Sequence, residues 1–464
     1  MGAPADQAML TLKAADLNVT TFWTPRNLAA VTRGNWVNPP EDTLLLGLSI
    51  DSRTLNAGQV YLAIKGERLD GHGFLDQAFE RGASCAITQQ LTKTQIYGTS
   101  KTRERPILIV DNTVHALQSI AAAYRIVLRQ QNVKVIAVTG SNGKSTTRHL
   151  IHTILSARLN GTQAPKSFNN HIGVPLTLLG ASVDHNFVVV EIGMNRPGEI
   201  DTLARLVRPD AAVITNFGTA HLGNFESPGA IVREKCALLQ HIAPGGLAVV
   251  PDGTKARLPP DVRCTTVRAW PVKGLPLLGE HNRCNARTAI EIARWMGIEP
   301  ELINRTLPQI RPLPGRLEPR LLGELQLIDD SYNANPQSVI AAMRTLVTIQ
   351  AQRRVAILGD MLELGEQEVE EHYRIGQLLA KLPIQAAILI GPRSARTAEA
   401  LRKFNPRFLL HHYAGWTDEL PDWVSAFLKP RDAVLIKASR NLGLERLIPA
   451  IEKCFGRDHD SSLD

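Results

Sequence analysis

The chain is predicted to be an α/β protein with three domains, and three observations lead to that prediction. Its 464 residues exceed one ordinary domain, since roughly 150 residues per domain is typical. Short runs rich in Val and Ile alternate with stretches of helical periodicity along most of the chain, as in proteins built from βα units. One apolar run, residues 133–139, leads directly into "TGSNGKST", which is typical of a phosphate-binding turn between a strand and a helix.

Residues 1–112 are expected to form a small mixed α/β domain. Apolar runs at 44–50 and 59–64 are strand candidates separated by turn residues. The stretch 70–87, "DGHGFLDQAFERGASCAI", has the pattern of a turn, a helix and a strand. This domain carries the weakest fold signal of the three.

Residues 113–313 are expected to form a central domain with a parallel sheet. A helix is predicted over 145–159, directly after the glycine loop. Strand candidates that are apolar almost throughout lie at 133–139, 186–192, 211–215 and 246–250. Such continuous apolar strands indicate a sheet that is covered on both faces.

Residues 314–464 are expected to form a doubly wound, Rossmann-like domain. Five strand candidates separated by helical stretches lie at 325–329, 354–358, 386–390, 407–411 and 433–437. Ligands in such folds bind beyond the carboxyl ends of the strands. The residues of note expected at those ends are Asp329, Asp330, Gly359, Asp360 and Lys437.

The net charge and the cysteines indicate which kind of ligand and which cellular compartment to expect. The net charge is +8 without a Lys/Arg run, and aromatic residues are only 5%, so we expect small anionic ligands rather than nucleic acid. The five cysteines form no C-x-x-C pair, which argues against a disulfide framework or a zinc site. No secretory signal pattern or apolar run of about 18 residues is present. We therefore expect a cytoplasmic protein without a membrane span. A monomer is expected, although nothing in these patterns determines the oligomeric state.

The glycine loop is shorter than the common G-x-x-x-x-G-K-[ST] pattern, because Val138 stands where its first glycine would be. Gly140 and Gly143 would let backbone N–H groups approach a phosphate, and the following helix would add its positive end. Lys144 would pair with the β- and γ-phosphates, and Ser145 could ligate Mg²⁺. The alternative is an ordinary strand–turn–helix junction that contains a lysine.

Other polar residues permit a functional and a structural interpretation. Glu191 ends an apolar strand, where a metal-binding carboxylate or an ordinary surface acid could lie. Asn282 and Asn285 open a predicted helix, and from their residue type a capping role is favoured over adenine recognition. Arg316 follows the junction of the second and third domains, either as a linker residue or as a ligand of phosphate charge.

Taken together, these stretches resemble the Mur ligase family of ATP-dependent amino-acid ligases of peptidoglycan synthesis. The loop is similar to the family's shortened form, T-G-[ST]-[NS]-G-K-[ST]. The resemblance runs from "SIDSRTLNAGQVYLAIKGERLDGHGFLDQAFERGA" to "LIKASRNLGLE". The segments "DDSYNANPQS", "LGDMLELG" and "KSFNNHIGVPLTLL" resemble the branch that adds D-alanyl-D-alanine to UDP-N-acetylmuramoyl-tripeptide. The third-residue-adding branch usually carries a "DNPR" segment, which is absent here.

The resemblance implies roles for individual residues. Lys144, His221, Lys235 and Arg316 would be catalytic. Two Mg²⁺ ions would be held by Ser145, Glu191, His221 and a carbamylated Lys235. The residues implied at ATP are Gly140, Ser141, Asn142, Gly143, Lys144, Ser145, Thr146, Asn282, Asn285, Arg316 and Asp330. The residues implied at the UDP-sugar, its peptide and the incoming dipeptide are Ser52, Arg53, Asn169, Asn170, Asn195, Asn333, Lys437, Ser439 and Arg440.

The implied reaction activates the terminal carboxylate as an acyl phosphate, which the amine of D-alanyl-D-alanine then attacks. The third domain is expected to swing in, bringing Arg316 and Asp330 to ATP. His372 is a candidate for the base that deprotonates the amine, and the third residue of the acceptor, diaminopimelate or lysine, stays open. Gly223 stands where the branch often has an acid.

The alternative functions are the neighbouring branch, a folylpolyglutamate synthase and a non-catalytic relative. A GTPase switch is excluded, because the guanine motif [NT]-K-x-D is missing.

Overall fold

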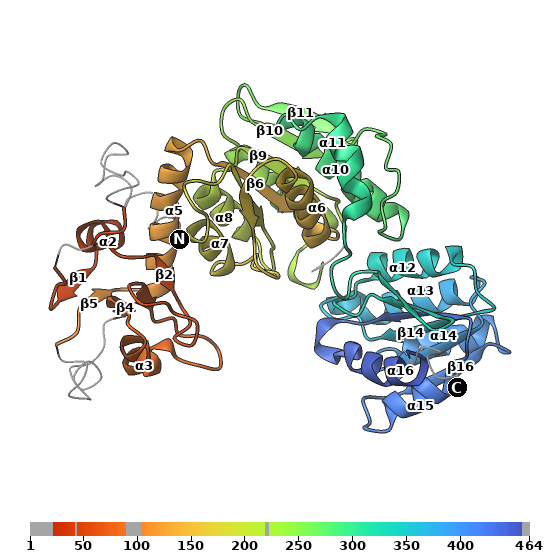
Figure 1. Cartoon of the computed structure of the whole chain (residues 1–464). Coiled ribbons are helices and arrows are strands. Elements are labelled where there is room, and N and C mark those ends of the chain that lie inside the picture. Colours follow the sequence, from red (N-terminus) through yellow and green to blue (C-terminus); the bar gives the residue numbers. More distant parts are fainter. Residues whose placement is uncertain (1–21, 42–43, 90–103, 219–221, 457–464) are drawn as a thin grey trace, which may run out of the picture.

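A computed structural model describes residues 22–41, 44–89, 104–218 and 222–456. It contains three β-sheets in chain order, of five, six and six strands, each with helices packed on it (Figure 1). The predicted fold class, α/β in three sheets, is therefore confirmed. No helix within the described ranges is long and apolar enough to span a bilayer.

The first sheet has the strand order β1-β5-β4-β3-β2. Its strands are β1 (Asn35–Val37), β2 (Leu48–Ser49), β3 (Val60–Leu62), β4 (Cys85–Gln89) and β5 (Ile107–Val110). Only β1 runs antiparallel to its neighbour. The turn, helix and strand predicted over 70–87 are present as a 3₁₀ turn, α3 (Leu75–Glu80) and β4, and α2 (Pro25–Thr32) completes the described part of the domain.

Helix α5 (Thr113–Gln130) joins the first and second domains by packing against both. Its buried Leu117 belongs to one apolar cluster that includes Leu28 and Val60 of the first domain and Val135 and Val190 of the second. The first domain is therefore anchored to the central one by a continuous core across the predicted boundary at residue 112, rather than by a linker alone.

The central sheet is wholly parallel, in the order β11-β10-β9-β6-β8-β7. The four predicted strands are present as β6 (Lys134–Thr139), β8 (Phe187–Glu191), β9 (Ala211–Ile214) and β10 (Leu247–Val250). The edge strands β7 (Gly161–Gln163) and β11 (Arg263–Thr266) were not predicted, because they are short and mostly polar.

Helices cover both faces of the central sheet, as its apolar strands predicted. One face packs on α5, α7 (Gly173–Leu179), α8 (Glu199–Val207) and α9 (Pro228–Ala237). The other packs on α6 (Lys144–Ser156), α10 (Glu280–Trp295) and α11 (Pro300–Thr306). Successive residues of β6 alternate between these two cores, as the pleat of a strand requires.

The third sheet has the order β12-β13-β17-β14-β15-β16. The five predicted strands are β13 (Leu325–Asp329), β14 (Arg353–Gly359), β15 (Ala386–Ile390), β16 (Leu409–Tyr413) and β17 (Asp432–Lys437), all parallel. The antiparallel β12 (Glu318–Leu322) was not predicted, because its side chains are only partly buried.

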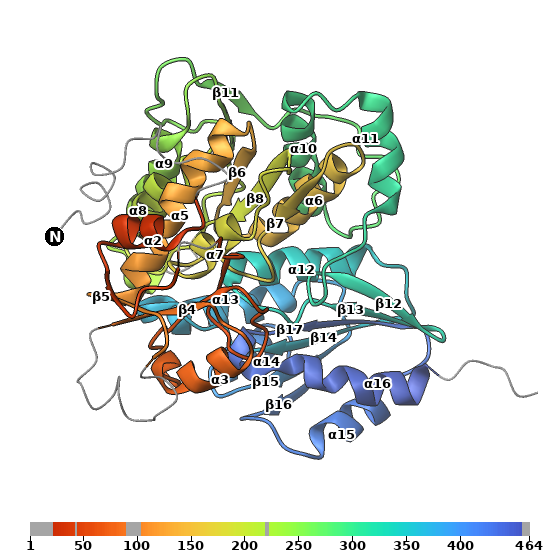
Figure 2. The same ribbon diagram turned by 60° about the vertical axis from the view of Figure 1, so that its left-hand side comes forward.

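Helices lie on both faces of the third sheet, so the doubly wound prediction is confirmed. Helices α12 (Pro336–Thr348), α13 (Glu368–Leu379) and α14 (Ala395–Phe404) pack on one face, and α15 (Leu420–Phe427) and α16 (Ile448–Phe455) on the other. Helix α12 lies at the boundary with the central domain in both views (Figures 1 and 2).

Candidate active site between the second and third domains

A cavity of about 1630 Å³ opens where the three domains meet. Its walls include the glycine loop, the carboxyl end of β8, the start of α10 and the carboxyl ends of β13 and β17, while the first domain contributes Glu67. Of the residues expected at the carboxyl ends of the third sheet, Asp330 and Lys437 line this cavity, whereas Asp329, Gly359 and Asp360 do not.

The glycines of the loop are required by its backbone. Gly140 has φ +143° and Gly143 has φ +80°, both in the region that L side chains rarely adopt. A Cβ at Gly140 would lie 1.9 Å from Thr215 Oγ1, and one at Gly143 would lie 2.7 Å from Asn285 Oδ1. Both positions thus exclude a side chain, and the loop can turn from β6 into α6 within four residues.

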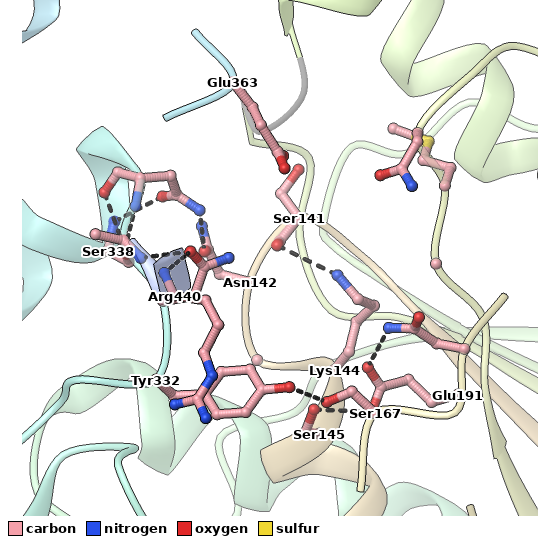
Figure 3. A pocket seen from close by; sticks show the side chains of 18 of the residues that line it. Ser141, Asn142, Lys144, Ser145, Ser167, Glu191, Tyr332, Ser338, Glu363 and Arg440 are labelled. Carbon is pink, nitrogen blue, oxygen red and sulfur yellow. Dashed lines mark hydrogen bonds between the residues drawn. The ribbon is translucent and has the colours of Figure 1, made fainter. Parts of the chain in front are cut away.

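Lys144 begins α6 and its amine folds over the loop (Figure 3). Its Nζ donates to the carbonyl of Gly140 at 2.8 Å and to that of Ser141 at 3.4 Å. Burial lowers the pKa of the Lys144 amine, and the charge of Glu191 acts in the opposite direction. The amine lies beside the first turn of α6, whose N–H groups and dipole favour an anion.

Glu191 lies at the end of β8, paired in register with Val138 directly before the loop. Its carboxylate is 1% exposed and accepts from Ser145 Oγ at 2.8 Å and from Asn169 Nδ2 at 2.9 Å. Arg148 lies 3.7 Å away. A hydroxyl and a carboxylate side by side are oxygen donors of the kind that Mg²⁺ prefers.

Lys235 lies on α9 with a 1% exposed side chain. Its nearest polar contact is the sulfur of Met194, 3.8 Å from Nζ, and it forms no ion pair within the described part of the chain. Burial, reinforced by the charge of Lys144, lowers the pKa of Lys235 to about 7. His221, the other residue expected on this side of the site, lies outside the described residues.

Within the described ranges, the acidic and histidine side chains near Glu191 and Lys235 do not form a metal-binding cluster. No group of three or more His, Cys, Asp or Glu side chains that could hold a metal ion occurs there. Of the four predicted magnesium ligands, Ser145 and Glu191 lie together on the cavity wall. Lys235 is not among the residues that line the cavity. Binding of magnesium by these residues stays a prediction.

The capping role favoured for Asn282 and Asn285 is wrong. The N-cap of α10 is Gly279, and both asparagines lie inside the helix and are buried. Asn282 Nδ2 donates to the carbonyl of Leu278 at 2.8 Å, and Asn285 Nδ2 donates to Asn282 Oδ1 at 3.1 Å. Both side chains line the cavity, on the side where Asn285 lies against the glycine loop.

The third domain contacts the glycine loop directly. Arg316 Nη2 donates to Ser145 Oγ at 2.9 Å, across a sequence separation of 171 residues. Asn335 Nδ2 donates to Asn142 Oδ1 at 2.6 Å. Asp330 instead accepts from Lys437 Nζ at 2.6 Å, so this carboxylate orders the third domain rather than the loop.

Asn335 was missed as a site residue. Its side chain accepts from Ser338 N at the start of α12, and Ser338 reciprocates in a capping box. The sequence "NP" before a helix signals such a cap, but no sequence pattern shows that the same amide reaches another domain.

The predicted substrate residues fall into two groups. Those that line the cavity are Asn169, Asn170, Asn195, Asn333, Lys437, Ser439 and Arg440. Ser52 and Arg53 do not line it: Ser52 Oγ is buried and donates to Gln77, while exposed Arg53 pairs with Asp51 at 2.8 Å. Contact of these two residues with a UDP-sugar stays a prediction.

His372 is poorly placed to act as the base. Its side chain is buried, Nε2 accepts from the Met361 N–H at 3.0 Å, and Nδ1 lies 2.7 Å from the carbonyl of Glu368. Both ring nitrogens are thus engaged by the backbone, and His372 is not among the cavity residues. Its role is to fix the start of α13 against the end of β14.

Comparison with known proteins identifies the family. The Mur ligase catalytic domain matches residues 45–125, the Mur ligase middle domain residues 138–270, and the Mur ligase glutamate ligase domain residues 315–440. The UDP-N-acetylmuramoyl-tripeptide--D-alanyl-D-alanine ligase of Bacillus subtilis (strain 168) is 32% identical, over 92% of this chain and 97% of that protein. The equivalent ligase of Treponema pallidum (strain Nichols) is 31% identical, over 88% and 94%. A crystal structure of MurF from Acinetobacter baumannii superposes with a TM-score of 0.79 at 30% identity, covering 93% of this chain and 99% of that one. The chain therefore belongs to the Mur ligase family.

Proposed function

We propose that the protein joins the amine of D-alanyl-D-alanine to the terminal carboxyl group of UDP-N-acetylmuramoyl-tripeptide, converting ATP to ADP and phosphate. The observation that carries the proposal is the contact of Arg316 with Ser145. It brings a guanidinium of the third domain to the phosphate loop of the second. The similar proteins named above carry this activity in their names.

The reaction requires two anions to approach each other. A carboxylate oxygen attacks the γ-phosphorus and ADP leaves, which gives an acyl phosphate. The dipeptide amine then attacks the acyl carbon, loses a proton and expels phosphate. Lys144, Arg316 and the first turn of α6 supply the positive potential that lowers repulsion between carboxylate and triphosphate. The protein need not form a covalent bond to the substrate.

Magnesium fits the oxygen donors of the site. Ser145 and Glu191 would hold one ion, since their oxygens are 2.8 Å apart and the carboxylate is buried. When bound, the ion would neutralise part of the phosphate charge. Asn169 and Arg148 keep the Glu191 carboxylate in place.

Carbamylation of Lys235 is supported by its surroundings. A buried ammonium without an anionic partner is unfavourable, and a pKa of about 7 leaves much of the amine neutral at neutral pH. The neutral Nζ would attack CO₂ and lose a proton to solvent, which yields an anionic carbamate. Such a group would replace an uncompensated cation with an oxygen ligand suited to Mg²⁺.

Phosphate release tests the proposed function. We expect the purified protein to release phosphate with ATP and D-alanyl-D-alanine when one of two UDP-muramoyl-tripeptides, ending in diaminopimelate or in lysine, is present. The Lys144→Ala variant should release none. Release with neither tripeptide would refute the proposed substrates. Release with the UDP-muramoyl-dipeptide and a free diamino acid would instead identify the third-residue-adding reaction. Cytoplasmic location and a monomeric state stay predictions.

A further inference from the structure

Arg316 is held in the site without a carboxylate partner. Within the described ranges its guanidinium forms no ion pair. It donates to the neutral hydroxyl of Ser145 at 2.9 Å and lies over the ring of Tyr332, 4.1 Å from the centroid. A guanidinium that pairs with a carboxylate attracts an anionic ligand less strongly, because the carboxylate offsets its positive charge. An aromatic face can hold a guanidinium while leaving that charge available.

The ring of Tyr332 is itself fixed from several sides. Its backbone N–H donates to the carbonyl of Gly315 at 3.1 Å, which ties the ring to the segment that carries Arg316. Gly315 has φ +68°, and a Cβ there would lie 3.2 Å from Tyr332 N. Arg440 approaches the same ring at 5.6 Å, while its guanidinium pairs with Glu445.

The hydroxyl of Tyr332 crosses the domain boundary. It forms a hydrogen bond with Ser167 Oγ of the central domain (Figure 3). Ser167 lies two residues before Asn169, whose amide holds Glu191. The ring is thus anchored at one end by the third domain and at the other by the segment beside the carboxylate site.

We propose that Tyr332 is a positioning residue, which holds Arg316 over the phosphate loop without a direct carboxylate partner. The proposal rests on the proposed function only in placing ATP phosphates at this loop. The ring supplies the platform for the guanidinium, and the hydroxyl fixes the ring to Ser167. Arg316 is the group that meets the γ-phosphate, and Tyr332 acts through it.

Binding of nucleotide, rather than turnover, separates this proposal from the identity of the substrates. We would measure the affinities of ADP and of a non-hydrolysable ATP analogue by calorimetry. The variants are Tyr332→Phe, Tyr332→Leu, Arg316→Ala and the Tyr332→Leu/Arg316→Ala double variant. Tyr373→Leu is the matched control, because Tyr373 packs on Phe404 and is not among the cavity residues.

The expected result is specific to the triphosphate. Tyr332→Leu should lower the affinity for the ATP analogue by roughly threefold to thirtyfold, the range that a cation–π contact supports. The affinity for ADP should fall by clearly less. Tyr332→Phe keeps the ring and should stay within about threefold of the parent affinity. In the double variant the tyrosine substitution should have no further effect, since Arg316 is already gone.

Two results would overturn the proposal. One is equal weakening by the Phe and Leu variants, which would assign the effect to the hydroxyl alone. The other is a double variant whose fold-loss of affinity equals the product of the losses caused by Arg316→Ala and Tyr332→Leu. That result would show that the tyrosine does not act through the arginine. Thermal denaturation identifies variants that fail to fold. If Tyr332→Leu does not fold, Tyr332→His replaces it in the single and double variants, with the same expected results. Failure of the proposed function would appear separately, as absent phosphate release by the parent protein.

Discussion

At the scale of single residues, Lys235 has the most unusual surroundings for its residue type. Lys235 is fully buried, and within the described ranges the one hydrogen-bond partner of its amine is the sulfur of Met194, which is unusual for an ordinary structural lysine. Because the pKa is lowered to about 7, the reactive neutral amine dominates above that pH and is lost below it. We expect a carbamate signal in ¹³C NMR with labelled bicarbonate, rising between about pH 6 and pH 8.

Substitution provides the control for this prediction. Lys235→Ala should lack the signal and lose turnover by a factor on the order of 100 or more, as expected when a ligand to a catalytic cation is removed, while remaining folded. A fully active alanine variant, or a parent protein without the signal at pH 8, would rule out the carbamate.

Gly140 gives a second prediction at the residue scale. In Gly140→Ala the new Cβ would collide with Thr215 Oγ1 in a backbone conformation that L residues avoid. We expect a loss of stability of about 1–3 kcal/mol and a fall in nucleotide affinity. Calorimetry and chemical denaturation measure both. Gly415→Ala is the matched control, since nothing lies within 4 Å of its Cβ and its φ is not positive; an equal effect of the two substitutions would contradict the steric argument.

At the scale of elements, the start of α12 combines two roles that one substitution can separate. Asn335 caps the helix and also bonds to Asn142. Asn335→Ser should keep the cap, because serine is a good N-cap residue, but its side chain is too short for the second bond. Asn335→Ala should lose both. We therefore expect a stability loss of about 1 kcal/mol for Ala only, with weakened nucleotide binding for both.

The measurements for this prediction are thermal denaturation and nucleotide titration of the two variants. A serine variant as unstable as the alanine variant would show that capping is not what Asn335 contributes. A serine variant with parental affinity would show that the bond to Asn142 has no part in binding.

Sequence patterns predicted the elements of this chain better than the contacts between them. The buried strands β6, β8, β9 and β10 are apolar almost throughout, so their composition identifies them. Edge strands such as β11 and β12 bury too little to leave that pattern.

The residues of the candidate site show the same contrast between local features and contacts between domains. Glu191 and the glycine loop follow from strand ends, whereas the Arg316–Ser145 and Asn335–Asn142 bonds span 171 and 193 residues. No local spacing encodes such bonds. The capping interpretation of Asn282 failed for a different, local reason, because the helix begins earlier, after a glycine.

At the scale of the whole molecule, the second and third domains meet at a pair of glycines as well as at the loop. A Cβ at Gly223 would lie 2.9 Å from Gly365 N, and one at Gly365 would lie 2.7 Å from Gly223 Cα. A side chain at either position would therefore collide with the backbone of the other domain. If the third domain swings in on ligand binding, as the sequence analysis predicts, we expect a side chain at either glycine to limit that movement.

We expect Gly223→Asp to separate the two domains. Small-angle scattering with a non-hydrolysable ATP analogue and the sugar-peptide should give a larger radius of gyration than the parent protein shows with the same ligands, and turnover should fall. Gly415→Asp, on open surface of the third domain, should change neither. An unchanged radius of gyration for Gly223→Asp would mean that the glycine contact does not limit closure.

The central claim is that a carboxylate is phosphorylated at the loop that Lys144, Glu191 and Arg316 surround. Transfer of ¹⁸O tests it most directly, with a UDP-muramoyl-tripeptide labelled in its terminal carboxylate. An acyl phosphate predicts that each phosphate released during ligation carries one ¹⁸O from the substrate, detected by mass spectrometry. Unlabelled phosphate accompanying the ligated product would contradict the mechanism.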